Sequence, residues 1–365
     1  MTAVEPRRDP VPIVSLTEYE PLARDIMEPA AFDYIAGGAW DEQSLVEAEA
    51  AWRRRRLRPR VLVDVAHVDP ATTMAGASIP MPVAIAPMAA HGLAHPSAEC
   101  ASARAAAAAG VPFTLSTMST ASIEDVAAAA PDGIRWFQLY PQADPKRSRS
   151  LVARAADAGY SALVVTVDLP VLGYRERDLR SGFDLPGPHG NFPDRGPDHA
   201  SHGGETSGFD ILQHDLDRGL VWSDLATIRS WSSLPIILKG ILTAEDARIA
   251  VEEGIDGIVV SNHGARQLDR AVATVDVLEE VVEAVAGRTE VWVDGGIRRG
   301  LDVVTALALG ARGVLVGRPI LWALAAGGQA GVEQALAILR TETILAMTLL
   351  GARTPGDVTR GHVAG

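Results

Sequence analysis

Eight short apolar runs, separated by stretches with helical periodicity, constrain the fold of this 365-residue chain more than any other feature. This alternation is typical of βα units that build a parallel sheet. Several helical stretches end at a glycine, such as Gly110, Gly159 and Gly254, the residue preferred just past a helix end. The predicted strands are 82–87, 111–116, 134–140, 162–168, 235–240, 257–262, 290–294 and 313–317. The helices predicted between them include 97–109, 145–158, 244–253, 274–286 and 300–309.

Eight strands that are each followed by a helix close into a barrel more simply than into an open, doubly wound sheet. We therefore predict an α/β fold, a (β/α)8 TIM barrel, as a single domain over residues 1–365. Residues 1–80 form an N-terminal extension whose helical stretches near 16–36 and 41–51 would cap the bottom of the barrel or reach its mouth. Residues 175–222, after strand four, have a middle rich in Gly and Pro, which predicts a long lid loop.

Composition and charge exclude several classes of protein. Hydrophobic residues make up 47% of the chain, which argues against disorder, and the net charge of −13 argues against nucleic acid as the main partner. A short basic run at Arg53–Arg56 is interpreted as a solvated or ion-paired structural segment. One cysteine, Cys100, no signal-like N-terminus and no long apolar segment together favour a cytoplasmic protein without a membrane span.

Histidines occur in two places where a metal site has to be considered. One pair is spaced i, i+4 in a loop-to-helix stretch, and three more lie in the lid without Cys, Asp or Glu at ligand spacing. We therefore predict no metal site. These histidines are His91 and His95 in the first place, and His189, His199 and His202 in the second.

The heptad Ser-Asn-His-Gly-Ala-Arg-Gln at 261–267 is the strongest functional signal. It directly follows the β-branched run 257–260, at the strand end where α/β barrels place their chemistry. His263 is suited to abstract a proton, and Arg266 to hold a carboxylate in a bidentate fork. Because an isolated Asn-His-Gly usually marks only a turn, the interpretation depends on the other strand ends.

Polar and small residues also follow the other predicted strands. The sequences DGGIRRG after strand seven and VGRP after strand eight place glycines and arginines where barrels commonly bind phosphate. Lys239 is either paired with a carboxylate or faces a cofactor that gains negative charge, and Asp168 either caps the lid or holds His263. The strand-end residues are Ala89, Ser116, Gln138, Tyr140, Thr166, Asp168, Lys239, Ser261, Asp294, Gly295, Gly296, Arg298, Gly317 and Arg318.

Seven motifs in one order give the chain a family resemblance from about residue 15 to 350. They are FDYIAGGA at 32–39, FQLY at 137–140, TVD at 166–168, LKG at 238–240, SNHGARQLD at 261–269, DGGIRRG at 294–300 and VGRP at 316–319. Together they resemble the FMN-dependent 2-hydroxy-acid oxidases and dehydrogenases, the family of glycolate oxidase and lactate oxidase. Within it, MAAHGLAHP at 88–96 looks most like the bacterial lactate oxidases.

The resemblance implies specific roles around an FMN cofactor. His263 would be the base, Arg175 and Arg266 would clamp the substrate carboxylate, and Tyr34 and Tyr140 would orient the substrate. Lys239 would stabilise the anionic reduced ring near its N1 and O2 edge. The implied FMN contacts are Pro87, Met88, Ala89, Ser116, Gln138, Thr166, Lys239, Ser261, Asp294, Gly295, Gly296, Arg298, Gly317 and Arg318.

Two departures from the family pattern concern the substrate. Where glycolate oxidases have Trp, this chain has Met118, a flexible apolar wall in place of a flat ring. The lid tyrosine of lactate oxidases has no counterpart in residues 182–210. We therefore predict a substrate that is lactate-like or larger, including aromatic 2-hydroxy acids.

The leading hypothesis is oxidation of an (S)-2-hydroxy acid to the 2-oxo acid, with O2 reduced to H2O2. A soluble dehydrogenase with another electron acceptor and a lactate monooxygenase stay open, because the differences lie in acceptor choice and product release. From other classes, an FMN-dependent isomerase would not need two arginines around a base, and a cofactor-free binding protein would be colourless. The family implies a homotetramer or homo-octamer of barrels.

Overall fold

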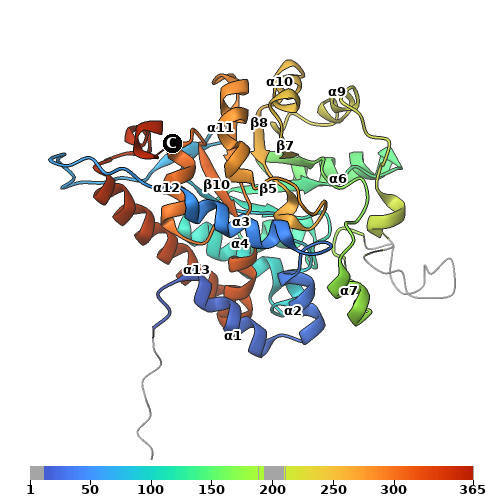
Figure 1. The fold of residues 1–365 in the computed structure, drawn as a ribbon. Helices are drawn as coiled ribbons and strands as arrows, with labels where there is room; N and C mark the ends of the chain where they lie inside the picture. Colours follow the sequence, from blue (N-terminus) through green and yellow to red (C-terminus); the bar gives the residue numbers. More distant parts are fainter. Residues whose placement is uncertain (1–11, 188, 193–208, 210, 365) are drawn as a thin grey trace, which may run out of the picture.

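Eight parallel strands form a closed barrel, as predicted, in a computed structural model that describes residues 12–187, 189–192, 209 and 211–364 (Figure 1). Neighbouring strands pair in chain order, and the last pairs with the first to close the barrel. Nearly every strand residue is buried, which explains the continuous apolar runs. The strands are β3 (Val83–Ile85), β4 (Phe113–Leu115), β5 (Arg135–Leu139), β6 (Ala162–Thr166), β7 (Ile236–Ile241), β8 (Gly257–Val260), β9 (Glu290–Val293) and β10 (Gly313–Val316).

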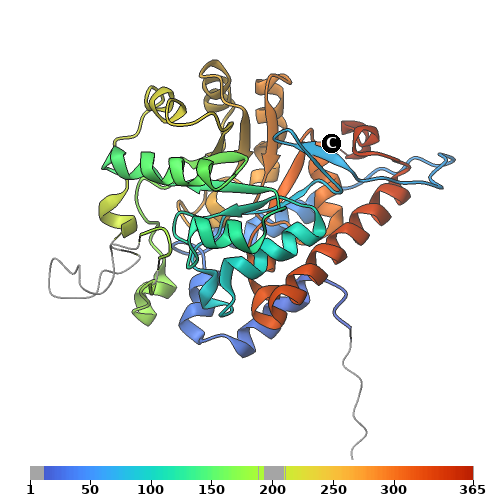
Figure 2. The same cartoon turned by 180° about the vertical axis from the view of Figure 1, so that it is seen from behind.

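Helices surround the barrel on the outside (Figures 1 and 2). The five predicted helices are all present, with bounds within one residue of those expected. The last helix is longer than a barrel unit requires: backbone angles at Gly327 and Gly328 interrupt it, and it continues against α4 and α1. These helices are α4 (Ala98–Ala109), α5 (Ile123–Ala129), α6 (Pro145–Asp157), α9 (Asp224–Arg229), α10 (Ala244–Glu252), α11 (Thr274–Val285), α12 (Gly300–Ala308) and α13 (Arg318–Leu350).

Large rings fill the centre of the barrel beneath the mouth. The indoles of Trp136 and Trp292 are 5.8 Å apart between centroids and completely buried. Gly257 leaves the space that Trp292 occupies, since a Cβ there would lie 2.2 Å from the indole. Because strand side chains alternate, the residues two positions further on, Gln138 and Asp294, also point inward. The barrel is thus apolar at its centre and polar at its C-terminal mouth.

The N-terminal extension covers both ends of the barrel. At the mouth, α2 contacts the first helix of the lid, α7 (Glu176–Ser181), and Figure 1 shows the two on the same side. At the opposite end, Met74 of a short hairpin packs with the two tryptophans. Pro29 divides the helical stretch predicted at 16–36 into two helices. The elements are α1 (Tyr19–Ile26), α2 (Pro29–Ala36), α3 (Gln43–Arg54), β1 (Thr72–Met74) and β2 (Ala77–Ile79).

The lid segment contains regular structure at both of its ends. Besides α7, it has a helical turn at Ile211–Asp215, and most of its Gly- and Pro-rich middle lies outside the described residues. No helix in the described ranges combines the length and the apolar character that crossing a bilayer would need.

Candidate active site

One cavity at the barrel mouth brings together most of the predicted site residues. They come from all eight strand ends, the extension and the lid, which converge because the C-terminal ends of barrel strands face one side. Its lining includes Tyr34, Pro87, Met88, Ala89, Ser116, Met118, Tyr140, Thr166, Arg175, Lys239, His263, Arg266, Asp294, Gly295, Gly296, Arg298, Gly317 and Arg318. The other three predicted residues, Gln138, Asp168 and Ser261, lie behind this lining and hydrogen-bond to Ser116, His263 and Lys239 respectively.

His263 is held in one orientation by hydrogen bonds from several directions. Its Nδ1 lies 2.8 Å from Oδ1 of Asp168, and its Nε2 lies 3.3 Å from the Tyr140 hydroxyl. Its backbone φ of +58° is in the left-handed region, which a non-glycine residue adopts only when its surroundings enforce it. The following Gly264 and Ala265 also have positive φ. This turn directs Nε2 toward the cavity, where a base is useful.

The charges around His263 favour a neutral imidazole beside a charged carboxylate. Burial lowers the pKa of His263, and the nearby Asp168 carboxylate only partly opposes this. Burial alone would raise the pKa of Asp168, but His263 and Lys239 outweigh it, so that this pKa lies below its usual value. Burial raises the pKa of Tyr140, which therefore stays a hydrogen-bond donor. A neutral histidine with an oriented free nitrogen is ready to accept a proton.

Two arginines lie beside this base, one from the lid and one from the heptad. The guanidinium carbons of Arg175 and Arg266 lie 6.0 and 4.8 Å from the centroid of the Tyr34 ring. Burial and the neighbouring Arg266 lower the pKa of Arg175 to about 10, so that it stays charged at neutral pH. One buried and one half-buried positive charge, in a chain with a net charge of −13, form a site for a small anion.

A second pair of arginines lies after strands β9 and β10. Arg318 donates to the carbonyl oxygens of Ile35, Gly37 and Gly264, and burial lowers its pKa to about 9. Arg298 forms an ion pair of 3.0 Å with Glu49 of α3. Both side chains therefore tie the N-terminal extension to the barrel mouth as well as lining the cavity.

Lys239 is paired with a carboxylate, the first of the two alternatives left open by its sequence position, and it also lines the cavity. Its Nζ lies 3.4 Å from Oδ2 of Asp294 and donates to the Ser261 hydroxyl at 3.0 Å. Burial alone would lower its pKa, but Asp294 and Asp168 outweigh it and raise that pKa. The ammonium is therefore a permanent positive charge at the cavity wall.

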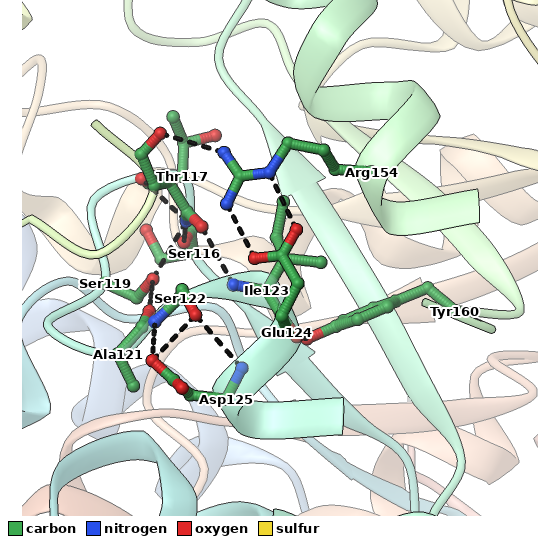
Figure 3. A network of polar contacts seen from close by, with 11 residues as sticks. Ser116, Thr117, Ser119, Ala121, Ser122, Ile123, Glu124, Asp125, Arg154 and Tyr160 are labelled. Atoms are coloured by element: carbon green, nitrogen blue, oxygen red, sulfur yellow. Dashed lines mark hydrogen bonds and ion pairs between the residues drawn. The ribbon is translucent and has the colours of Figure 1, made fainter. Parts of the chain in front are cut away.

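Met118 is held by a hydrogen-bonded turn after β4, part of which Figure 3 shows. Asn191 from the lid is 3% exposed and fastens this turn. Its Nδ2 donates to the carbonyl oxygens of Ser116 and Thr117 at 3.2 and 3.1 Å, and its Oδ1 accepts from the Ile123 amide. The sequence alone does not predict a role for Asn191, because one asparagine in a Gly- and Pro-rich stretch carries no local signal.

The prediction for one of the lid histidines, His189, is wrong. His189 was expected in a solvated loop, but it is 7% exposed because its neighbour Asn191 draws this part of the lid onto the barrel. His199 and His202 lie outside the described residues. His91 is buried and hydrogen-bonds to Ser102, and in the described part of the chain no group of three or more His, Cys, Asp or Glu side chains is arranged to hold a metal ion.

A barrel with this mouth has the features of an oxidoreductase that binds a phosphorylated cofactor and a small anionic substrate. Residues 23–365 match the FMN-dependent dehydrogenase family. Glycolate oxidase of Spinacia oleracea is 48% identical over 358 residues, 96% of each chain. The peroxisomal (S)-2-hydroxy-acid oxidase GLO4 of Oryza sativa subsp. japonica is 49% identical over 353 residues, 96% of this chain and 95% of the relative.

Solved structures agree with this assignment. A mandelate oxidase crystallised with (S)-4-hydroxymandelic acid is 46% identical and superposes with a TM-score of 0.90 over 96% of this chain and 98% of that one. The chain thus belongs to the FMN-dependent 2-hydroxy-acid oxidase family. FMN is its cofactor, and oxidation of a 2-hydroxy acid is its reaction. The lactate-oxidase likeness of residues 88–96 stays a prediction.

The residues present at the mouth fit FMN. Among the described residues, the buried polar atoms at this end of the barrel that lack a hydrogen-bond partner include Nε2 of Gln138, Oγ1 of Thr166 and Oδ1 of Asp294. Orphaned polar atoms of this kind are costly unless a ligand or water satisfies them, and the edge of a flavin ring offers such partners. Gly295 and Gly296 line the cavity with φ of 87° and 79°, a left-handed conformation that glycine adopts without strain.

Proposed function

We propose that the protein oxidises an (S)-2-hydroxy acid with O2: R–CH(OH)–COO⁻ + O2 → R–CO–COO⁻ + H2O2. One observation carries this assignment. His263, oriented through Nδ1 by Asp168, has its other nitrogen in a cavity that also contains two charged arginines. A base and an anion clamp in one cavity match the two needs of a 2-hydroxy acid, proton removal and carboxylate binding.

Each side chain of the cavity has a distinct part in this proposal. Nε2 of His263 takes a proton from the substrate, and the Asp168 carboxylate stabilises the imidazolium that results. Arg175 and Arg266 hold the carboxylate, while the hydroxyl groups of Tyr34 and Tyr140 orient the substrate by hydrogen bonds. When bound, FMN accepts the two electrons of the oxidation.

The FMN would be held by residues from several strand ends of the mouth. Lys239 places a permanent positive charge at the cavity wall, where negative charge on the cofactor would be stabilised. The phosphate would lie by the arginines and glycines after β9 and β10. The residues proposed to hold FMN are Pro87, Met88, Ala89, Ser116, Gln138, Thr166, Lys239, Ser261, Asp294, Gly295, Gly296, Arg298, Gly317 and Arg318.

The substrate side chain is proposed to be that of lactate or larger and to include aromatic groups. Met118, Leu169 and Leu212 give the cavity an apolar wall, and Met118 is an unbranched side chain that can repack. The mandelate oxidase of the comparison, whose structure contains (S)-4-hydroxymandelic acid, supports both the aromatic ring and the (S) configuration.

The oligomeric state and the cellular location are also proposed. The family resemblance supports a homotetramer or homo-octamer of barrels. A cytoplasmic location is supported by the single cysteine, although one rice relative is named as peroxisomal.

The test is an anaerobic screen of the FMN-loaded protein against glycolate, lactate, longer 2-hydroxy acids and mandelates, each chiral acid as both enantiomers. The expected result is loss of the visible flavin absorbance with (S)-acids, fastest with large side chains, and rapid recovery with peroxide release when air is admitted. Slow recovery in air would indicate a dehydrogenase, and a decarboxylated product without peroxide would indicate a monooxygenase. No bleaching with any 2-hydroxy acid would overturn the proposal.

A further inference from the structure

Gln267, the last residue of the heptad, connects the two segments that carry the proposed catalytic groups. Its Nε2 donates to the carbonyl oxygens of Asp168 and Val171 at 3.2 and 2.7 Å. Its Oε1 accepts from the Gly173 amide at 3.2 Å and from Nη2 of Arg175 at 3.4 Å. The amide group thus uses two donor and two acceptor positions, its full hydrogen-bonding capacity. All four partners belong to one stretch, residues 168–175, after β6.

The two segments are in close contact around this side chain. The carbonyl oxygen of Arg266 accepts from Nε of Arg175 at 3.3 Å. Gly173 lies so near that a Cβ there would be 2.3 Å from the Arg266 oxygen and 2.8 Å from Cα of Gln267. Arg175 is therefore fixed on one edge by residues 266 and 267, which leaves the rest of its guanidinium for the cavity that it lines.

The partners that orient Arg175 are neutral. The Gln267 amide and the Arg266 carbonyl accept its hydrogen bonds, and among the described residues no carboxylate lies within ion-pairing distance of its guanidinium. The neighbouring Arg177, by contrast, forms ion pairs with both Asp33 and Glu42. A neutral acceptor directs a guanidinium as a carboxylate would, but it does not neutralise the charge.

We propose that Gln267 is a positioning residue that directs Arg175 toward the substrate carboxylate while leaving its positive charge available, and that also fixes the backbone of Asp168. This inference rests on the role proposed above for Arg175. It predicts that the charge state of residue 267, more than its shape, sets the affinity for an anionic substrate.

The decisive variant is Gln267→Glu, which is isosteric. The new carboxylate would pair with Arg175 and would face the carbonyl oxygens of Asp168 and Val171 without a donor. The measurement is anaerobic flavin reduction, titrated with (S)-mandelate and with its neutral amide, 2-hydroxy-phenylacetamide. We expect the preference for acid over amide to fall by about tenfold or more, the size of one lost charge-assisted hydrogen bond. A purely structural role would weaken both ligands alike and leave their ratio unchanged.

Matched variants make the outcome specific. Gln329→Glu is the charge control. Gln329 lies on α13, outside the cavity lining, and accepts a hydrogen bond from Arg104 at 2.7 Å. The acid-to-amide ratio of this variant should equal that of the wild type. Gln267→Met keeps the shape without hydrogen bonds, and it serves if the Glu variant does not fold. In Gln267→Met, Arg175 keeps its charge but loses its orientation. Acid binding should therefore weaken by less than in Gln267→Glu, and the acid-to-amide ratio should again be lower than in the wild type.

The failure of this inference can be told from the failure of the proposed function. Arg175→Met should lower the acid-to-amide ratio because it removes the charge. If it does so while both Gln267 variants retain the wild-type ratio, the positioning role is wrong and the arginine clamp stands. If Arg175→Met leaves the ratio unchanged, the carboxylate role of Arg175 is itself wrong.

Discussion

The Asp168 carboxylate lies 2.8 Å from Nδ1 of His263, although 95 residues separate the two in the chain. This contact fixes the imidazole ring and leaves Nε2 as the nitrogen that faces the Tyr140 hydroxyl and the cavity. It also places a negative charge beside the group that would become positive when a proton is taken from the substrate.

Asp168→Asn tests this contact directly. The amide preserves the shape but cannot stabilise an imidazolium, so the rate of flavin reduction should fall by about 10²–10⁴-fold, as for other oriented histidine bases. Anaerobic stopped-flow absorbance measures this rate, and the FMN content of the variant shows that the cofactor site is intact. A rate close to that of the wild type would contradict the assignment of Asp168.

The pH dependence of flavin reduction follows from the lowered pKa of His263. Burial moves this pKa below its ordinary value of 6.5, and only the neutral ring accepts a proton. The rate should therefore rise from acid pH to a plateau, with its midpoint below 6.5. Asp168 raises the pKa of His263, so the midpoint should move further toward acid in Asp168→Asn. A midpoint above neutrality in the wild type would be inconsistent with a buried, mostly neutral His263.

Met118→Trp should change the choice of substrate. The larger, rigid ring would fill space that the flexible side chain leaves, so preference should shift from mandelates toward glycolate by about 10–200-fold, the usual range for a changed apolar contact. The ratio of kcat/KM for the two acids measures the shift. Met347→Leu, a buried change in α13, is the control and should leave the ratio unaltered. An unchanged ratio in Met118→Trp would mean that the substrate side chain lies elsewhere.

Asn191→Asp should loosen the turn that holds Met118. A carboxylate oxygen would replace the amide nitrogen that donates to Ser116 and Thr117, leaving buried acceptors facing one another. We expect a loss of about 1–3 kcal/mol in the free energy of unfolding, measured by denaturant titration of the FMN-loaded protein. Glu124→Gln, which breaks a partly exposed ion pair with Arg154, should cost at most about 1 kcal/mol. Equal stability of Asn191→Asp and the wild type would contradict the anchoring role.

The barrel could be predicted from the sequence because its strands are buried on both faces and therefore form continuous apolar runs. The strand-end residues followed from the same pattern, since the topology sends each strand end to one mouth. Contacts between segments distant in the chain could not be predicted in this way. Gly240 is an example: its φ of +116° and the 2.6 Å between a Cβ placed there and Cβ of Asp168 depend on how β7 lies against the end of β6.

The same distinction applies to Gln267 and Asn191. Each contributes through hydrogen bonds to backbone atoms of another segment, and no local periodicity or motif spacing encodes such partners. The length of α13 is a related case, because no local pattern predicts that the helix continues past Gly327 and Gly328, whose backbone angles interrupt it.

The hydrogen bonds of Arg266 and Arg318 to the stretch 34–37 all go to its carbonyl oxygens, and Arg266 also lies over the Tyr34 ring. Every amino acid supplies that oxygen, so these bonds place no demand on the side chains that the stretch carries. A substitution at position 35 therefore leaves the hydrogen bonds of the two arginines in place, whereas an insertion or deletion that shifts the carbonyls would detach the extension from the mouth. Selection here acts on the path of the main chain.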